Sequence, residues 1–248
     1  MKISILMATY ETPSDLLISA IDSVAEQTHE DWELVIKDGS EKNPAIDDGR
    51  VRDRFNWYGS RINYAVSYDS PPAAQCGVST HNGCYAAIND CVRRSTGEVL
   101  SIMQADDERG NSTVLEHVNK IFEAVLPVKP FLVYGKCDWI GRNGEFLETK
   151  TPINIPVTWQ KMLRDYPLYT PAFFWNRSVH VKFGLFDYAN YKWCADLDFW
   201  LRCLKGGMET AYVCGVLGKY RVWETSLSKD NGHIMGPESL AIQKKHGL

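Results

Sequence analysis

The stretch Leu100-Ser-Ile-Met-Gln-Ala-Asp-Asp-Glu108 decides how the rest of this sequence is interpreted. Its first half is apolar and predicts a buried strand, and two adjacent carboxylates, Asp106 and Asp107, follow that strand directly. In α/β proteins, ligands bind beyond the carboxyl ends of such strands. Paired aspartates there suit a divalent cation that prefers oxygen ligands, such as Mg²⁺ or Mn²⁺. The alternative is a turn in which an aspartate caps the helix that starts near Asn111.

The composition is that of an ordinary globular domain, with 248 residues of which 44% are hydrophobic and 23% charged. The net charge is −4 and Lys and Arg are scattered, so no nucleic-acid partner is expected. Seven cysteines without a CxxC pair predict reduced thiols and a cytoplasmic protein. No stretch approaches the roughly 20 apolar residues of a membrane span, so no transmembrane segment is expected. Peripheral attachment to a membrane stays open, as does the oligomeric state.

The first part of the chain alternates between strands and helices, which predicts βαβ units and a parallel sheet. The expected elements are strands over 3–8, 32–36 and 62–66, helices over 14–27 and 80–94, and the strand that leads into Asp106. Polar residues follow three of these strands, namely Thr9, Asp38 and the Asp106-Asp107 pair. Carboxyl ends of parallel strands meet at one edge of a sheet, so these side chains are expected to converge on one ligand.

The second part of the chain predicts a more mixed structure. Its expected elements are a helix over 113–125, a strand over 131–140, a turn over 142–144, a short helix after Pro156, an extended aromatic segment over 168–175, a helix over 195–205, a strand over 211–220 and a weak helix over 237–245. Asp196 and Asp198 fall in the first turn of the 195–205 helix, where the helix dipole favours negative charge. From the residues alone, stabilising that helix end is the simpler role for both.

Four segments in the first part resemble successive motifs of one enzyme family. They are Ile3-Ser-Ile-Leu-Met-Ala-Thr-Tyr-Glu11, Trp32-Glu-Leu-Val-Ile-Lys-Asp-Gly-Ser40, Asn82-Gly-Cys-Tyr-Ala-Ala-Ile-Asn89 and Gln104-Ala-Asp-Asp107. Two later segments, Lys182-Phe-Gly-Leu-Phe-Asp187 and Ala195-Asp-Leu-Asp-Phe-Trp-Leu-Arg202, are similar to the acceptor-side motifs of the same family. In this order and spacing they resemble the family 2 glycosyltransferases of the GT-A fold, from Ile3 to about Ser228.

The resemblance implies a fold and a domain organisation. The expected fold is α/β, a single GT-A-type domain with a mostly parallel, Rossmann-like sheet flanked by helices and a mixed acceptor-side half. Residues 1–108 would bind the nucleotide-sugar donor, residues 109–228 would bind the acceptor and carry out catalysis, and residues 229–248 would form a C-terminal tail.

The resemblance also implies a role for particular donor-side residues. Thr9 and Asp38 would contact the nucleotide base, and Asn89, with Tyr85, would line the donor pocket. Asp38 would accept a hydrogen bond from a ring N–H, which favours a UDP-sugar.

The remaining implied roles concern the metal, the phosphates and the acceptor. Asp107 would bind Mn²⁺ or Mg²⁺, and Asp106 would contact the ribose or the metal. Arg221 is expected beside the phosphates, since a guanidinium group binds oxyanions in a bidentate manner. Asp196 would be the general base that takes the proton of a hydroxyl on a glycan or other acceptor, so that the sugar is transferred with inversion.

Two residues depart from the family pattern. Ala195 replaces the first acid of a Glu-Asp pair, which leaves Asp196 as the candidate base. Trp223 stands where the family often has a histidine near the metal or the diphosphate, so His233 or water would have to supply that contact.

These departures support a second hypothesis, a non-catalytic nucleotide-sugar binding module. A nucleotidyltransferase is a third, but the loop Thr9-Tyr-Glu-Thr-Pro13 lacks the glycine and the basic residue that a phosphate-binding loop would need.

Overall fold

The computed structural model describes residues 1–66, 83–125, 129–153, 155–223 and 232–247. Its strands are β1 (Ile3–Thr9), β2 (Trp32–Asp38), β3 (Ile62–Val66), β4 (Val99–Ile102), β5 (Glu108–Arg109), β6 (Phe131–Ile140), β7 (Phe146–Lys150), β8 (Phe173–Asn176) and β9 (Glu209–Arg221). Its α-helices are α1 (Ser14–Ala25), α2 (Gly49–Tyr58), α3 (Gly83–Arg94), α4 (Val114–Val125), α5 (Trp159–Arg164), α6 (Ser178–Phe183), α7 (Ala195–Lys205) and α9 (Gly232–Lys245).

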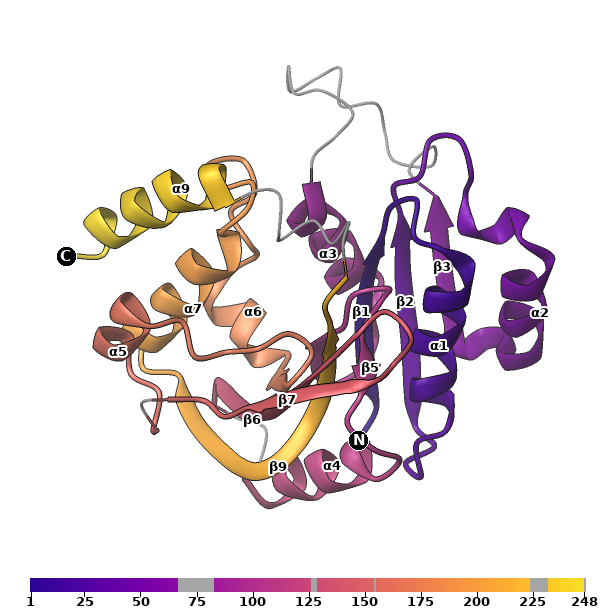
Figure 1. Ribbon diagram of the computed structural model, residues 1–248. Coiled ribbons are helices and arrows are strands. Elements are labelled where there is room, and N and C mark those ends of the chain that lie inside the picture. Colours follow the sequence, from indigo (N-terminus) through magenta and orange to yellow (C-terminus); the bar gives the residue numbers. More distant parts are fainter. Residues whose placement is uncertain (67–82, 126–128, 154, 224–231, 248) are drawn as a thin grey trace.

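In this part of the chain the strands form one curled sheet in the order β3-β2-β1-β4-β8-β6-β9-β5, with β7 paired to β6 (Figure 1). The neighbours β3, β2, β1 and β4 pair in parallel, as the alternation of strands and helices predicts. The second half of the sheet combines a parallel β6–β9 pair with antiparallel pairs. The predicted α/β fold, with its mixed second half, is confirmed.

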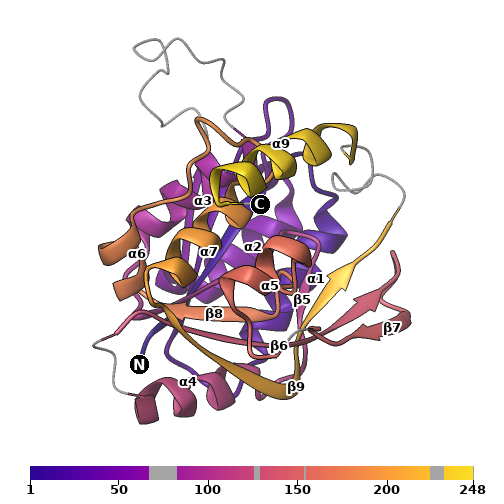
Figure 2. The same cartoon turned by 90° about the vertical axis from the view of Figure 1, so that its left-hand side faces the viewer.

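Strand β1 illustrates how the sequence produces two layers of helices. Side chains alternate across a strand, so Ile3, Ile5 and Met7 pack into one apolar core, while Leu6 packs into the other. The first core contains the apolar faces of α1 and α4 and Val51 of α2. The second core contains those of α3, α5, α6 and α7, which lie in front of the sheet in Figure 2.

The long strand β9 closes the second half of the sheet. It pairs with β6 in parallel as far as Arg221, with two register shifts on the way, and its residues Gly218 and Lys219 also pair with β5 in antiparallel orientation. The strand forms the curved ribbon of Figure 1. Gly218 permits this path because a Cβ atom there would lie 2.8 Å from the backbone carbonyl carbon of Pro171. The curl brings the end of β9 back to the residues that follow β4.

Most element boundaries agree with the sequence analysis. The α7 helix spans the predicted residues, while β9 and the last helix are longer than predicted, with α9 beginning at Gly232 instead of near Pro237. The α3 helix is described from Gly83, and the predicted start near Thr80 lies outside the described residues.

Asn89 joins α3 to the segment before α7. Its side chain is 1% exposed, its amide nitrogen donates to the carbonyl of Phe186 (2.8 Å), and its amide oxygen accepts from the Phe186 N–H (3.1 Å). These two hydrogen bonds pair with the backbone N–H and carbonyl of Phe186, a residue that lies outside the strands of the sheet.

We predict that Asn89→Ala lowers the free energy of unfolding by about 1–3 kcal/mol, because it leaves the buried Phe186 N–H without its acceptor, whereas the Phe186 carbonyl keeps the N–H of Tyr188. Urea unfolding followed by circular dichroism measures this. The matched control is Asn43→Ala at an exposed position, which should change stability by less than about 0.5 kcal/mol. Equal stability of the two variants would contradict the role given to Asn89.

Candidate functional site

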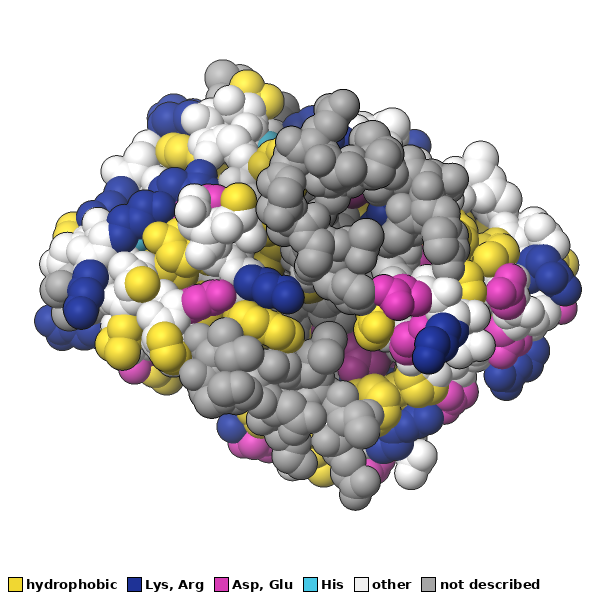
Figure 3. Space-filling view, turned by 90° about the horizontal axis from the view of Figure 1, so that it is seen from above, with side chains coloured by type: hydrophobic (Ala, Val, Ile, Leu, Met, Phe, Trp, Pro, Cys, Tyr) yellow, Lys and Arg dark blue, Asp and Glu magenta, His cyan; other side chains and the backbone are white. Residues whose placement is uncertain are grey.

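Polar side chains gather where three neighbouring strands end. Thr9 at the end of β1 lies opposite Asp38 at the end of β2 in the parallel register. The chain leaves β4 beside β1, with the N–H of Met103 donating to the Leu6 carbonyl (3.0 Å), and then reaches the Asp106-Asp107 turn. The predicted gathering at one edge is therefore what the fold produces. Figure 3 views the molecule from above, where Asp and Glu side chains border the middle of the face.

Asp38 is fully buried and holds the loop that follows β2. Its carboxylate accepts hydrogen bonds from the backbone N–H groups of Ser40 (2.8 Å) and Ala45 (2.7 Å) and from the Tyr64 hydroxyl (2.6 Å). The Thr9 hydroxyl donates to that of Thr12 (2.9 Å). Thr9 and Asp38, the residues expected to contact the base, thus lie at the carboxyl ends of β1 and β2. The hydrogen bonds of Asp38 fix the loop that follows β2.

Asp107 is a buried carboxylate that is only half satisfied. Its Oδ1 atom accepts from the backbone N–H of Arg221 (3.0 Å), whereas its Oδ2 atom has no hydrogen-bond partner among the described residues. Burial, and after it the adjacent Asp106 carboxylate, hold the pKa of Asp107 well above its usual range. An unpaired buried carboxyl is unfavourable, so this atom is suited to meet a cation.

The Arg221 guanidinium is turned inward. It is 2% exposed and donates to the carbonyls of Asp106 (2.7 Å), Gly141 (3.0 Å) and Arg142 (3.1 Å), and it forms an ion pair with Glu108. Arg221 therefore fixes the aspartate turn to the β6–β7 hairpin. The sequence analysis expected the Arg221 guanidinium beside the phosphates of the donor. In the structure its N–H groups donate to these protein partners.

Trp223 contacts the aspartate pair directly. Its indole Nε1–H donates to Oδ2 of Asp106 (2.8 Å), and the Arg142 guanidinium lies over its ring at 5.5 Å. An indole nitrogen is a donor without a free lone pair, so Trp223 orients Asp106 but does not ligate a metal. The side chain of His233, the other candidate for that contact, lies outside the described residues.

The residues present fit a divalent cation in part. Among the described residues, no three His, Cys, Asp or Glu side chains cluster as a metal-binding set. The free Oδ2 atom of Asp107, next to a second carboxylate, nevertheless has the chemistry of an oxygen ligand for Mg²⁺ or Mn²⁺. A cation there would take its other ligands from outside the protein, as Mg²⁺ does when it binds through one or two carboxylates and substrate phosphates.

Asp196 stands in the first turn of α7 and is partly exposed. Its Oδ2 atom accepts from the Tyr166 hydroxyl (2.7 Å) and its Oδ1 atom from the Leu197 N–H (2.9 Å). Burial raises the pKa of Asp196, and hydrogen bonds from Tyr166 and Tyr85 act in the opposite direction. Asp196 is thus a reachable carboxyl that is a stronger base than an ordinary aspartate.

Cys84, near the start of α3, lies between the two acidic groups. Burial raises the pKa of its thiol to about 11, and the negative charges of Asp196 and Asp106 add to the rise. The Gln104 side-chain amide donates to its sulfur (3.3 Å). Asp196 and Asp106, 90 residues apart in sequence, therefore both lie near this thiol.

The site contains residues that the sequence did not single out. Tyr166 follows α5 and has no spacing relation to Asp196, so no sequence signal could have identified it. Cys84 is adjacent to Tyr85 in a motif that the sequence analysis did quote. Asn89 of the same motif uses both its amide nitrogen and its amide oxygen in hydrogen bonds to the Phe186 backbone.

Comparison with solved structures identifies proteins of the same fold. The crystal structure of S. aureus TarS covers 90% of this chain at 15% identity and a TM-score of 0.64. TarS 1–349 in complex with UDP covers 90%, and in complex with UDP-GlcNAc 93%, each at 14% identity and a TM-score of 0.64. The chain shares with these structures a GT-A-like α/β fold.

The chain spans only 37% of the full TarS chain and 61% of the two complexed ones. No protein-family model and no curated protein matches the sequence. Across the residues described here, no helix has both the length and the apolar character needed to cross a membrane.

We predict that Tyr166→Phe raises the pKa of Asp196 further, because the phenol donates to the ionised carboxylate and stabilises it. Titration of the Asp196 carboxyl carbon by NMR measures the change. Tyr10→Phe, at a residue that is 49% exposed, is the control and should leave the titration in place. An unchanged or lowered pKa in Tyr166→Phe would show that the hydroxyl does not stabilise this carboxylate.

Proposed function

We propose that this chain is a glycosyltransferase that moves a sugar from a nucleotide-diphosphate sugar to an acceptor hydroxyl. The observation that carries the proposal is the half-satisfied Asp107 beside Asp106 beyond the carboxyl ends of β1 and β4, in a turn whose Gln104 contacts Cys84, a thiol that also lies near Asp196. The GT-A-like fold and the family 2 motifs support it independently. On those motifs we propose that the chain belongs to glycosyltransferase family 2.

We propose a UDP-sugar as the donor, bound by residues 1–108. TarS 1–349, which shares this fold, has been crystallised with UDP and with UDP-GlcNAc. The exits of β1 and β2, with Thr9 and Asp38, would hold the base, and the aspartate turn would face the diphosphate. The acceptor would then bind to residues 109–228, on the side of α7.

Asp196 is proposed as the general base. An acceptor hydroxyl oxygen attacks the anomeric carbon, its proton passes to the Asp196 carboxylate, and the bond to the diphosphate breaks on the opposite face, which inverts the anomeric centre. The raised pKa of Asp196 favours proton transfer, and the Tyr166 hydroxyl holds one of its oxygens in place. Because the base must be ionised, activity should fall at acidic pH, with a midpoint above that of an ordinary aspartate.

The aspartate turn would hold the cation that the fold family implies. Asp107 would be the ligand, with Asp106 beside it, and the cation would supply positive charge for the diphosphate that leaves. Trp223 and Arg221 keep these two carboxylates in position.

We predict that Asp196→Asn lowers turnover of a UDP-sugar by about 10²–10⁴-fold, since the amide cannot accept the proton. UDP binding should be retained, and a ligand at 100 times its Kd adds about 2.7 kcal/mol of stability, which a thermal shift detects. The assay measures UDP release with a panel of hydroxyl acceptors and Mn²⁺.

Asp31→Asn, at an exposed position remote from the strand exits, is the matched control and should keep full turnover. UDP binding without turnover of any donor by the wild-type protein would instead favour the non-catalytic binding module. Failure to bind any nucleotide or nucleotide sugar would reject both.

We predict that Asp107→Asn weakens Mn²⁺ binding at least tenfold in the presence of UDP, as measured by titration calorimetry. The variant should fold, because it replaces a buried, half-satisfied acid by a neutral group. Asp53→Asn on the exposed face of α2 is the control. Mn²⁺ binding of equal strength in wild type and Asp107→Asn would remove Asp107 from the cation site.

A further inference from the structure

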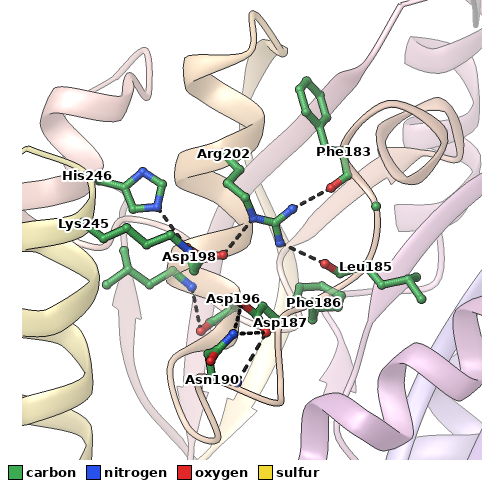
Figure 4. A network of polar contacts seen from close by, with 12 residues as sticks. Phe183, Leu185, Phe186, Asp187, Asn190, Asp196, Asp198, Arg202, Lys245 and His246 are labelled. Atoms are coloured by element: carbon green, nitrogen blue, oxygen red, sulfur yellow. Dashed lines mark hydrogen bonds and ion pairs between the residues drawn. The ribbon is translucent and has the colours of Figure 1, made fainter.

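The C-terminal helix α9 lies alongside α7 and faces it with a regular set of side chains. The residues on this side are Glu238, Ile242 and Lys245, which are spaced by four and three residues and so fall on one face of α9, and His246, which directly follows the helix. Ile242 is fully buried and His246 is 7% exposed, which identifies this face as the packed one. Figure 4 shows the contact at the C-terminal end of α9, where Lys245 and His246 point toward Asp198 of α7.

Glu238 holds the chain that enters α7. Its carboxylate accepts three consecutive backbone N–H groups, from Lys192 (3.1 Å), Trp193 (2.8 Å) and Cys194 (3.0 Å). Cys194 is the N-cap of α7 and makes no side-chain capping hydrogen bond. Glu238 therefore supplies, from 44 residues away, a negative charge that the N-terminus of α7 lacks at its own cap.

The second contact between the two helices is centred on Asp198. This carboxylate is fully buried and accepts from Arg202 (2.8 Å), Lys245 (2.8 Å) and His246 (3.0 Å). Figure 4 shows the three cationic or imidazole side chains converging on it from α7 and α9. The first turn of α7 is thus fixed to α9 on both sides of Asp196, at Cys194 and at Asp198.

We propose that Glu238 is a positioning residue for the reaction, which acts by holding the turn that presents Asp196 to the acceptor. Asp196 is two residues after Cys194, and its Oδ1 atom is already engaged by the next backbone N–H within that turn. If the entry to α7 moves, the carboxylate moves with it, while the donor-side residues are untouched. This inference rests on the proposed function, because it assigns Asp196 the role of base.

The test compares Glu238→Ala and Glu238→Gln with the wild-type protein. In Glu238→Ala the amides of Lys192, Trp193 and Cys194 should exchange with deuterium at least tenfold faster, because they lose their acceptor. With a UDP-sugar and Mn²⁺, kcat should fall about 10–100-fold, while KM for the donor and UDP binding stay within twofold. Glu238→Gln keeps one acceptor oxygen and should lie between Glu238→Ala and wild type on both measures.

Glu30→Gln, an exposed carboxylate far from α7 in sequence, is the matched control for the loss of one charge. Faster exchange with an unchanged kcat would overturn the proposal and leave Glu238 a purely structural contact. Unchanged exchange would overturn it as well. If the wild-type protein binds UDP but transfers no sugar, the proposed function fails and the positioning role fails with it. If the wild-type protein transfers sugar and Glu238→Ala has the same kcat, only the positioning role is rejected.

Discussion

The buried guanidinium of Arg221 is the contact on which the geometry of the acidic site depends. It ties the last residue of β9 to the aspartate turn after β4, to the β6–β7 hairpin and to Glu108. Its own backbone N–H then meets Asp107. A buried cation of this kind is stable only when its N–H groups are paired, so the turn, the hairpin and the strand end must adopt their positions together.

The two acidic groups of the site have different surroundings. Asp107 is placed against the sheet, where burial and Asp106 disfavour its charge, and it retains one oxygen without a hydrogen bond among the described residues. Asp196 is placed at a partly exposed helix end, where burial raises its pKa and hydrogen bonds from Tyr166 and Tyr85 act in the opposite direction. The first environment suits the cation of the proposed function, and the second suits its proposed general base.

The proposed acceptor side of the molecule is assembled from distant parts of the chain. Tyr166 follows α5, Asp196 is in the first turn of α7, and Glu238 belongs to α9. None of these contacts follows from local spacing, and each depends on helices that pack on one face of the sheet through the same apolar core. The proposed donor side, in contrast, is built from the ends of adjacent strands, where the alternation of strand and helix already brings Thr9 and Asp38 together.

The sequence by itself determined the α/β class, the parallel first half, most helix boundaries and the edge at which Thr9, Asp38 and the aspartate pair meet. These features follow from local periodicity and from the handed connection of βαβ units, both of which operate over a few tens of residues. Only the tertiary structure decided the partners of individual polar groups. In the structure the Arg221 guanidinium is buried against the aspartate turn, and the Trp223 indole donates to Asp106. The Asn89 amide bonds to the Phe186 backbone, and the Glu238 carboxylate accepts from the backbone at the start of α7. Most buried polar groups in a folded protein are paired, but which partner each one finds depends on contacts between segments far apart in the chain.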